Sequence, residues 1–334
     1  MKKKNVFAWG VCVGLTAWGC FGSVGCAERI PETEITVYMP DGAPALALAE
    51  LMHGDTESDG VTYRVVDTSE AITPLLSKLT NEEENKNADF CVLPLTAASM
   101  KLGTGEKYVM LGVVTQGNLY LISQDSVTYG KDNLTDLIGK TVLVKNMAEV
   151  PGRTLKAALT RGGVAWKEYD GEKVLDKVNL ATAADSYEVE LLAEPAVSKR
   201  LGQNANWKVV GDLQALYGDC GLGQNGYPQA VLVAKKSFVE KKGDWTESFV
   251  EKIAKAGAWL YTASAEEIYG AVTGHFEDSG KTPTFTAATL GAETVSRCGV
   301  RFAYATDAKN AVESYLTEIG YALPASGFYR ETRK

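Results

Sequence analysis

The feature that most constrains the fold is a repeated order of segments in which a short apolar strand runs into a turn that opens a helix. Strands of this kind are predicted at 35–39, 63–67, 89–93 and 141–144. The turns that follow them carry Gly, Pro, Ser, Thr or Asn residues, which suit turns and helix starts. Strands that alternate with helices predict an α/β fold with mostly parallel sheets flanked by helices.

The same order restarts after Leu119, which predicts a second lobe. A chain of 334 residues has room for two lobes rather than one small core. A strand at 229–234 is predicted to return to the first lobe, and amphipathic helices are predicted at 245–261 and 307–319. Two α/β lobes that present strand ends and helix N-termini to one another would form a cleft, and such ends favour anionic ligand groups.

Residues 1–26 are predicted to be a lipoprotein signal peptide. Three lysines follow the first Met, 6–21 are almost entirely apolar, and small residues precede Cys26, as in secretory signals. The apolar run is shorter than the ~20 residues of a spanning helix, so a permanent transmembrane anchor is not expected. Lipid on the Cys26 thiol would anchor the mature chain. Lipidation at Cys20, or cleavage without lipidation, remains an alternative.

The charge of the chain argues against a nucleic-acid partner. The net charge is −8, and without the three lysines of the signal 31 basic and 42 acidic residues remain, which gives −11. Phosphate backbones require a basic surface. A small-molecule site can still be locally positive on an acidic protein.

The cysteines do not predict a disulfide framework. Of the six, Cys12 and Cys20 lie in the signal and Cys26 is assigned to the lipid. Those that remain are Cys91, Cys220 and Cys298. Cys91 lies in an apolar strand and is predicted to be a small buried hydrophobe. A bridge between Cys220 and Cys298 stays open as an alternative.

The candidate motifs for enzymatic chemistry lack the flanking elements or the spacing that they require. The glycines of 221–226 match a dinucleotide fingerprint, but the flanking residues predict neither the required strand nor the helix. The stretch 274–282 has one residue too many for a phosphate-binding loop. His53 and His275 are the only histidines, which leaves no histidine-rich metal site and disfavours a catalytic triad. The sequence therefore predicts neither a cofactor nor an enzyme.

Several stretches together resemble the solute-binding lipoproteins of ABC importers, in the nitrate/sulfonate/taurine and thiamine-pyrimidine group. These stretches keep the order and spacing of the family and lie at 35–49, 89–98, 117–123, 134–142, 150–155, 193–197, 227–230 and 296–298. The resemblance implies a two-lobed type II periplasmic binding protein-like fold with two crossings between the lobes. The implied parts are a linker at 27–34, lobe 1 at 35–116 and 214–334, and lobe 2 at 117–213.

The resemblance also implies a ligand site in the cleft, closed by hinge movement. The implied ligand-binding residues are Tyr38, Gly42, Ala43, Pro44, Thr68, Ser69, Leu95, Thr96, Tyr120, Val150, Pro151, Gly152, Arg153 and Glu194. Backbone N–H groups would hold the polar end of the ligand, and Tyr38, Tyr120 or Tyr187 would pack on its body.

Two of these assignments have alternatives. The hydroxyls of Ser69 and Thr96 would bind the ligand, or they would cap helices. Arg153 would pair with a carboxylate or sulfonate if it faces the cleft, and would otherwise be a solvated helix residue.

The implied function is capture of a small anionic or heterocyclic solute for an ABC permease and its ATPase, by an extracytoplasmic, lipid-anchored monomer. A receptor subunit for a membrane sensor is the main alternative. A surface hydrolase is a further one, which the two histidines disfavour.

Overall fold

The computed structural model describes residues 35–54, 60–77, 88–219, 226–277 and 282–331. Residues 34–334 form one compact unit. The predicted signal and linker lie outside the described residues, and so do Cys20, Cys26, Cys220 and most of the glycine-rich stretch 221–226.

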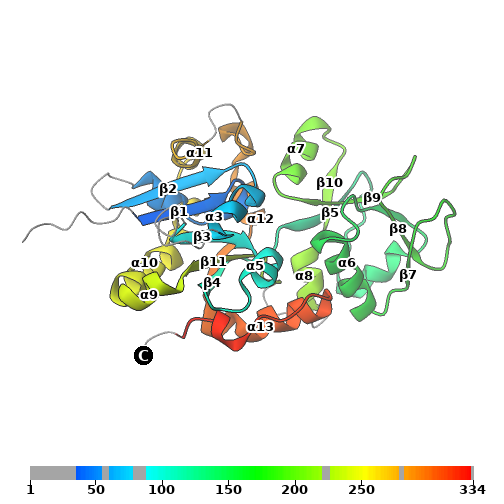
Figure 1. The fold of residues 1–334 in the computed structure, drawn as a ribbon. Coiled ribbons are helices and arrows are strands. Elements are labelled where there is room, and N and C mark those ends of the chain that lie inside the picture. Colours follow the sequence, from blue (N-terminus) through cyan, green and yellow to red (C-terminus); the bar gives the residue numbers. More distant parts are fainter. Residues whose placement is uncertain (1–34, 55–59, 78–87, 220–225, 278–281, 332–334) are drawn as a thin grey trace, which may run out of the picture. The chain divides into compact units, whose positions relative to one another are not determined.

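The described residues form two six-stranded sheets (Figure 1). The first sheet has the order β12-β4-β11-β3-β1-β2. Its strands are β1 (Ile35–Pro40), β2 (Val61–Val66), β3 (Phe90–Pro94), β4 (Tyr108–Thr115), β11 (Ala230–Lys235) and β12 (Val300–Tyr304). The second sheet has the order β10-β5-β9-β6-β8-β7. Its strands are β5 (Leu119–Ser123), β6 (Thr141–Leu143), β7 (Trp166–Glu168), β8 (Val178–Ala181), β9 (Val189–Ala193) and β10 (Lys208–Asp212).

Helices flank both sheets. Those in the part of the chain that forms the second sheet are η2 (Lys131–Leu137, 3₁₀), α6 (Val150–Arg161), α7 (Ala196–Gln203) and α8 (Leu213–Asp219). The α-helices of the remaining chain are α1 (Ala43–Leu46), α2 (Ala49–His53), α3 (Thr73–Ser77), α5 (Leu95–Leu102), α9 (Lys236–Lys241), α10 (Gly243–Ala256), α11 (Ala265–Thr273), α12 (Ala292–Arg297) and α13 (Ala305–Glu318). Its 3₁₀ turns are η1 (Ser69–Ala71), η3 (Trp259–Tyr261), η4 (Ala287–Thr289) and η5 (Ser326–Phe328).

The predicted α/β architecture with two sheets is confirmed, but both sheets are mixed rather than mostly parallel. In the first sheet β1 pairs in parallel with β2 and β3, whereas β11 is antiparallel to β3 and β4. In the second sheet β5 is antiparallel to β9 and β10. A parallel neighbour requires a long crossover connection. The strands β4, β5, β10 and β11 are connected by the passages between the sheets instead, and the pairs β4–β11 and β5–β10 are antiparallel. The predicted return of 229–234 to the first sheet is confirmed by β11.

The chain passes between the sheets twice. The first passage runs from the end of β4 at Thr115 to the start of β5 at Leu119. The second leaves β10 at Asp212, continues through α8 and reaches β11 at Ala230. Three residues of the first passage thus separate β4 of the first sheet from β5 of the second, so this connection is short.

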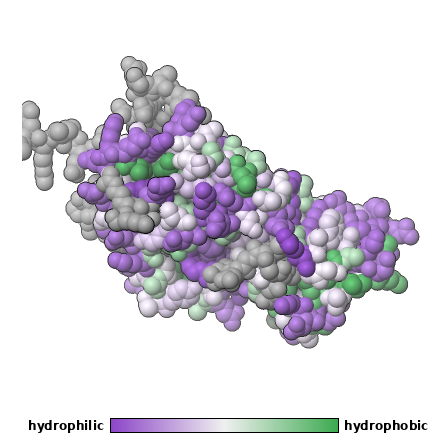
Figure 2. All heavy atoms as spheres, turned by 90° about the horizontal axis from the view of Figure 1, so that it is seen from below, coloured by the Kyte–Doolittle hydropathy of each residue, from purple (hydrophilic) through white to green (hydrophobic). Residues whose placement is uncertain are grey.

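Apolar burial holds each sheet to its helices. All residues of β4 are buried, and the Phe90 ring packs against the rings of Phe238, Trp245 and Phe249 at 5.1–5.7 Å between centroids. Such contacts remove apolar surface from water, at about 25 cal/mol per Å². On the face seen from below, hydrophilic residues predominate and hydrophobic ones occur in small, separate groups (Figure 2).

The buried cysteines are free thiols. Cys91 is 0% exposed, which confirms its prediction as a buried hydrophobe, and burial raises the pKa of its thiol. Cys298 is also buried with a free thiol, and Cys220, its partner in the alternative of a bridge, lies outside the described residues. Within the described ranges, no helix has the length and apolar character to cross a membrane.

Helix α13 joins the two halves from one side. It contacts β4 and β12 of the first sheet and lies along the lower edge in Figure 1. Its Tyr315 hydroxyl lies 2.8 Å from the Thr154 hydroxyl of α6, and both side chains are buried. The Glu318 carboxylate accepts a hydrogen bond from the Arg161 guanidinium of α6.

We expect the substitution Thr154→Val to lower the free energy of unfolding by about 1–3 kcal/mol. Valine keeps the shape of threonine but leaves the buried Tyr315 hydroxyl without this partner. Urea unfolding followed by circular dichroism measures the loss. Thr317→Val is the matched control because the Thr317 hydroxyl also donates to the carbonyl four residues earlier, but is exposed. The control should change stability by less than about 0.5 kcal/mol, and equal losses would contradict the assigned hydrogen bond.

Candidate functional site

A pocket of about 140 Å³ lies where the two passages meet the sheets. It is walled by the ends of β3 and β9, the starts of α5 and α6, both passages, and α13. The lining residues are Pro94, Leu95, Thr96, Asn118, Leu119, Val150, Pro151, Ala193, Pro228, Gln229 and Tyr315. Because residues of both sheets form its walls, its size depends on how the two halves close on each other.

Two carboxamides, those of Asn118 and Gln229, lie in the wall of the pocket. The Gln229 Nε2 donates to the Asn118 Oδ1 at 2.5 Å, and the Asn118 Nδ2 donates to the Glu194 carbonyl oxygen at 3.3 Å. The Gln229 Oε1 accepts from the Thr115 hydroxyl at 3.4 Å. None of the described residues that line the pocket carries a charge. Recognition here therefore depends on shape and hydrogen bonds.

The helix N-termini at the pocket have already used several N–H groups. The Leu95 N–H donates to the Gln229 carbonyl at 2.8 Å, and the Gly152 and Arg153 N–H groups donate to the carbonyls of Asn146 and Glu149 at 3.3 and 3.0 Å. Proline at position 151 has no N–H. The macrodipoles of α5 and α6 remain, but these particular donors are bound within the protein.

The size of the pocket suits a small ring. An apolar cavity of about 150 Å³ can hold a molecule of the size of benzene. The aliphatic residues Leu95, Leu119 and Val150 supply apolar surface, and Tyr315 supplies an aromatic one. The Tyr315 ring stacks on that of Tyr227 at 5.0 Å with an interplanar angle of 20°, which fixes its orientation.

The structure brings together four of the predicted ligand-binding residues. These are Leu95, Thr96, Val150 and Pro151. The prediction did not include Asn118 and Gln229, which also line the pocket. Asn118 lies at the first predicted crossing, directly before an apolar strand, and Gln229 is the polar first residue of the strand predicted at 229–234. A polar residue at the end of an apolar strand was the available signal.

The residues that follow β1 and β2 do not line this pocket. Gly42 has a φ of +92° and precedes the four-residue helix α1, which contains Ala43 and Pro44. Tyr38 is half-buried and packs against the core. In the next turn Thr68 is exposed and Ser69 half-buried.

The capping alternative for Ser69 and Thr96 is wrong. The N-cap positions of η1 and α5 are Thr68 and Pro94, with no side-chain capping hydrogen bond at either. Ser69 and Thr96 therefore lie within the first turn of their helices.

Arg153 has a role that neither sequence alternative included. Its Nε donates to the Ala148 carbonyl at 2.7 Å, and its guanidinium donates to the Ile319 carbonyl at 2.8 Å. The guanidinium also lies 4.9 Å from the centre of the Tyr321 ring, within range of a cation–π contact. The side chain thus ties the start of α6 to the residues after α13.

Tyr120 of β5 and Tyr187, which precedes β9, lie elsewhere. Tyr120 lines a separate hollow of about 270 Å³, and its hydroxyl donates to the Arg297 carbonyl at 3.1 Å. Burial raises the pKa of Tyr120, so that the phenol stays a donor. Tyr187 packs against the Trp207 ring at 6.3 Å.

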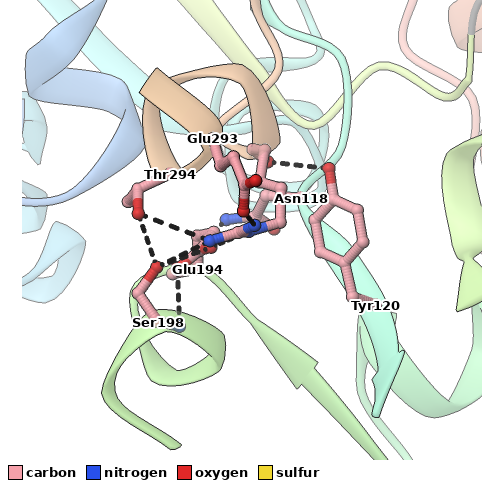
Figure 3. A network of polar contacts seen from close by, with 7 residues as sticks. Asn118, Tyr120, Glu194, Ser198, Glu293 and Thr294 are labelled. Atoms are coloured by element: carbon pink, nitrogen blue, oxygen red, sulfur yellow. Dashed lines mark hydrogen bonds and ion pairs between the residues drawn. The ribbon is translucent and has the colours of Figure 1, made fainter. Parts of the chain in front are cut away.

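Glu194 lies beside the pocket at the centre of a polar cluster (Figure 3). Its side chain is fully buried, and its Oε1 pairs with the Arg297 Nε of α12. The Ser198 hydroxyl donates to the same oxygen at 2.9 Å, and the Ser198 N–H donates to Oε2 at 3.2 Å. Glu194 is thus an internal ion-pair partner rather than part of the pocket lining.

A larger hollow of about 680 Å³ lies on the first-sheet side, between α2, β2 and α10. Its lining includes Tyr63, Trp245 and Lys252, and all of it comes from this half of the molecule. Movement of one half against the other could not enclose a ligand there. Among the described residues, no cluster of His, Cys, Asp and Glu could hold a metal ion.

Three solved structures from ABC transport systems share this fold. A crystal structure of an ABC transporter from Parabacteroides distasonis matches with a TM-score of 0.66 and 20% identity, over 90% of this chain and 100% of that one. The zinc-bound ligand-binding component of an ABC-type import system from Staphylococcus aureus matches with a TM-score of 0.53 and 10% identity, over 89% and 96%. The periplasmic aliphatic sulphonate-binding protein of Escherichia coli matches with 0.52 and 14%, over 90% and 94%.

These likenesses establish the fold, which is that of periplasmic binding proteins. No protein-family model matches the chain, and no curated protein does.

Gly152 is required by close packing at the start of α6. A Cβ there would lie 2.2 Å from the Met147 carbonyl oxygen. We expect Gly152→Ala to destabilise the protein by about 1–3 kcal/mol, because backbone must move to admit the methyl group. Urea unfolding measures the change.

Gly202 of α7 provides the matched control, because a Cβ there meets nothing within 4 Å. Gly202→Ala should be neutral or stabilising by up to about 1 kcal/mol, since alanine favours the helix. Similar losses in both variants would show that packing against Met147 is not the cause.

Proposed function

We propose that this protein is an extracytoplasmic solute-binding protein that captures a small molecule and delivers it to an ABC permease with its ATPase. The proposal includes lobe 1 at 35–116 and 214–334, lobe 2 at 117–213, and closure of the lobes about the two passages. Strands β1–β4, β11 and β12 in one sheet and β5–β10 in the other support this division. The chain performs no covalent chemistry in this proposal.

The observation that carries the proposal is the position of the 140 Å³ pocket. Both sheets, both passages and the starts of two helices contribute to its walls. In open α/β folds ligands bind beyond the carboxyl ends of strands, and β3 ends at this pocket. The similar structures include an import ligand-binding component and a sulphonate-binding protein, which agrees with a transport role.

Of the two predicted solute classes, the pocket favours the heterocyclic one. The lining is neutral, and several N–H groups at the starts of α5 and α6 are bound within the protein. A sulfonate or nitrate would lose hydration without gaining a cationic partner. A small ring with a polar edge would place its body against Leu119, Val150 and Tyr315 and its edge near Asn118 and Gln229.

We expect a small heterocycle, such as a pyrimidine, to raise the melting temperature of the protein by several degrees. A ligand at a hundred times its Kd stabilises the folded state by about 2.7 kcal/mol. Thermal unfolding with a panel of pyrimidines, aromatic acids, carboxylates, sulfonates and nitrate measures the shift. Failure of the whole panel would count against solute binding, and a shift with sulfonates alone would overturn the preference for a ring.

The variant Ala193→Phe locates the site. A phenyl group would fill much of the pocket, so the solute-induced shift should disappear while the protein still folds. Ala288→Phe is the control because Ala288 is exposed and lies in η4, outside the pocket. A solute shift that survives Ala193→Phe in full would place the binding site elsewhere.

The proposal also includes lipid attachment at Cys26. We expect Cys26→Ser to move the protein from the membrane to the soluble fraction in cell fractionation, because the serine hydroxyl would not be lipidated. Cys20→Ser is the matched control and should leave the protein in the membrane fraction. The opposite pattern would identify Cys20 as the lipidated residue, and membrane attachment of both variants would contradict the cysteine anchor.

A further inference from the structure

The cluster in Figure 3 joins residues that are distant in sequence and belong to the two halves of the molecule. Glu194 and Ser198 lie at the end of β9 and in α7, whereas Thr294 and Arg297 belong to α12. The Arg297 Nε donates to the Glu194 Oε1, and the Arg297 Nη2 donates to the Ser198 hydroxyl at 3.0 Å. The Ser198 and Thr294 hydroxyls lie 2.7 Å apart. The guanidinium thus bridges the two halves of the molecule.

Burial makes this pair different from surface ion pairs. The Glu194 side chain is 0% exposed and that of Arg297 is 15% exposed. A buried carboxylate that loses its cation is strongly unfavourable, because water does not replace the partner. The pair Arg161–Glu318 also joins the two halves, but the Arg161 side chain is 54% exposed, and such pairs contribute little.

The cluster is connected to the pocket through the backbone of Glu194. The Glu194 N–H donates to the Asn118 carbonyl at 3.1 Å, and the Glu194 carbonyl accepts from the Asn118 Nδ2. Asn118 in turn accepts from Gln229, and Ala193 beside Glu194 lines the pocket. The position of Glu194 therefore fixes one wall and one polar group of the pocket.

We propose that Arg297 is a positioning residue that latches the two lobes by pairing with Glu194, and so holds the pocket enclosed. The latch is made only when α12 and α7 meet, and its loss exposes the wall formed by Asn118 and Leu119. The inference depends on the proposed function only where it assigns the enclosed pocket to a solute. The closed state itself can be measured without any solute.

Hydrogen–deuterium exchange of the full-length protein tests the latch. Arg297→Gln removes hydrogen bonds to a charged group, so we expect the lobes to separate more often. Exchange should then be roughly ten to a hundred times faster in two segments. One segment is the start of α7, where the Ser198 amide donates to Glu194. The other is the first passage, where the Leu119 amide donates to the Gln214 Oε1. The strands β1 to β3 should keep wild-type exchange and so show that the variant is folded.

The matched control is Arg64→Gln, which breaks the half-exposed pair Arg64–Glu277 at 2.7 Å on the first-sheet side. It should leave both segments unchanged. Arg297→Lys should restore protection only in part, because one ammonium group cannot reproduce the fork of the guanidinium. If Arg297→Gln does not fold, Glu194→Gln removes the charge and keeps the shape, and the same two segments should exchange faster.

Two results would overturn the latch. In one, exchange in both segments stays within about twofold of wild type when Arg297 or Glu194 is neutralised. In the other, only the start of α7 exchanges faster while the first passage does not, which would limit the pair to stabilising α7. A failed solute panel combined with faster exchange in both segments would retain the latch and reject only the proposed solute binding.

Discussion

The constraint on which the structure depends is that two passages of chain must leave one sheet and enter another without leaving buried polar groups unpaired. Carboxamides meet this constraint because each offers both a donor and an acceptor. Gln229 of the second passage donates to Asn118 of the first, at 2.5 Å. The Gln214 Oε1 accepts from the Leu119 amide at 2.9 Å and from the Tyr227 hydroxyl at 3.1 Å. The two passages are thus bonded to each other, and the pocket lies where these bonds are made.

Charge is placed beside the pocket and not in it. Glu194 is adjacent to Ala193 of the pocket wall, yet its carboxylate is directed to Arg297. Arg153 follows Pro151 and Gly152, yet its guanidinium binds carbonyl oxygens near the end of α13. A neutral pocket discriminates through shape and hydrogen bonds, and a buried unpaired donor or acceptor costs about 1–3 kcal/mol when a ligand fails to match it. This arrangement explains why the cationic residues near the site do not by themselves indicate an anionic solute.

Much of the fold could be predicted from the sequence because it depends on local patterns. Apolar runs and the turns after them located β1, β3 and β6 to within one or two residues. Strand direction could not be obtained in this way, because an apolar run reads the same for parallel and antiparallel neighbours. The site was less predictable. The family resemblance implied Leu95 and Val150, but Asn118 gains its meaning from Gln229, which lies 111 residues away. The partner of Glu194 lies 103 residues away, and no periodic pattern connects the two.

The two sides of the pocket hold the lobes together with different numbers of contacts, and this difference determines which side can open. On the α13 side, three residues of α6 bind α13 or the residue after it: Thr154 bonds to the buried Tyr315 hydroxyl, Arg153 donates to the Ile319 carbonyl, and Arg161 pairs with Glu318. The Tyr315 ring is itself held within lobe 1 by stacking on Tyr227 at 5.0 Å. On the other side the contact is one cluster around Arg297, whose hydrogen bonds are directional and are lost within a short displacement. The lobes should therefore rotate about the α13 side and separate at Glu194 and Arg297, which places the mouth of the pocket at the ion pair.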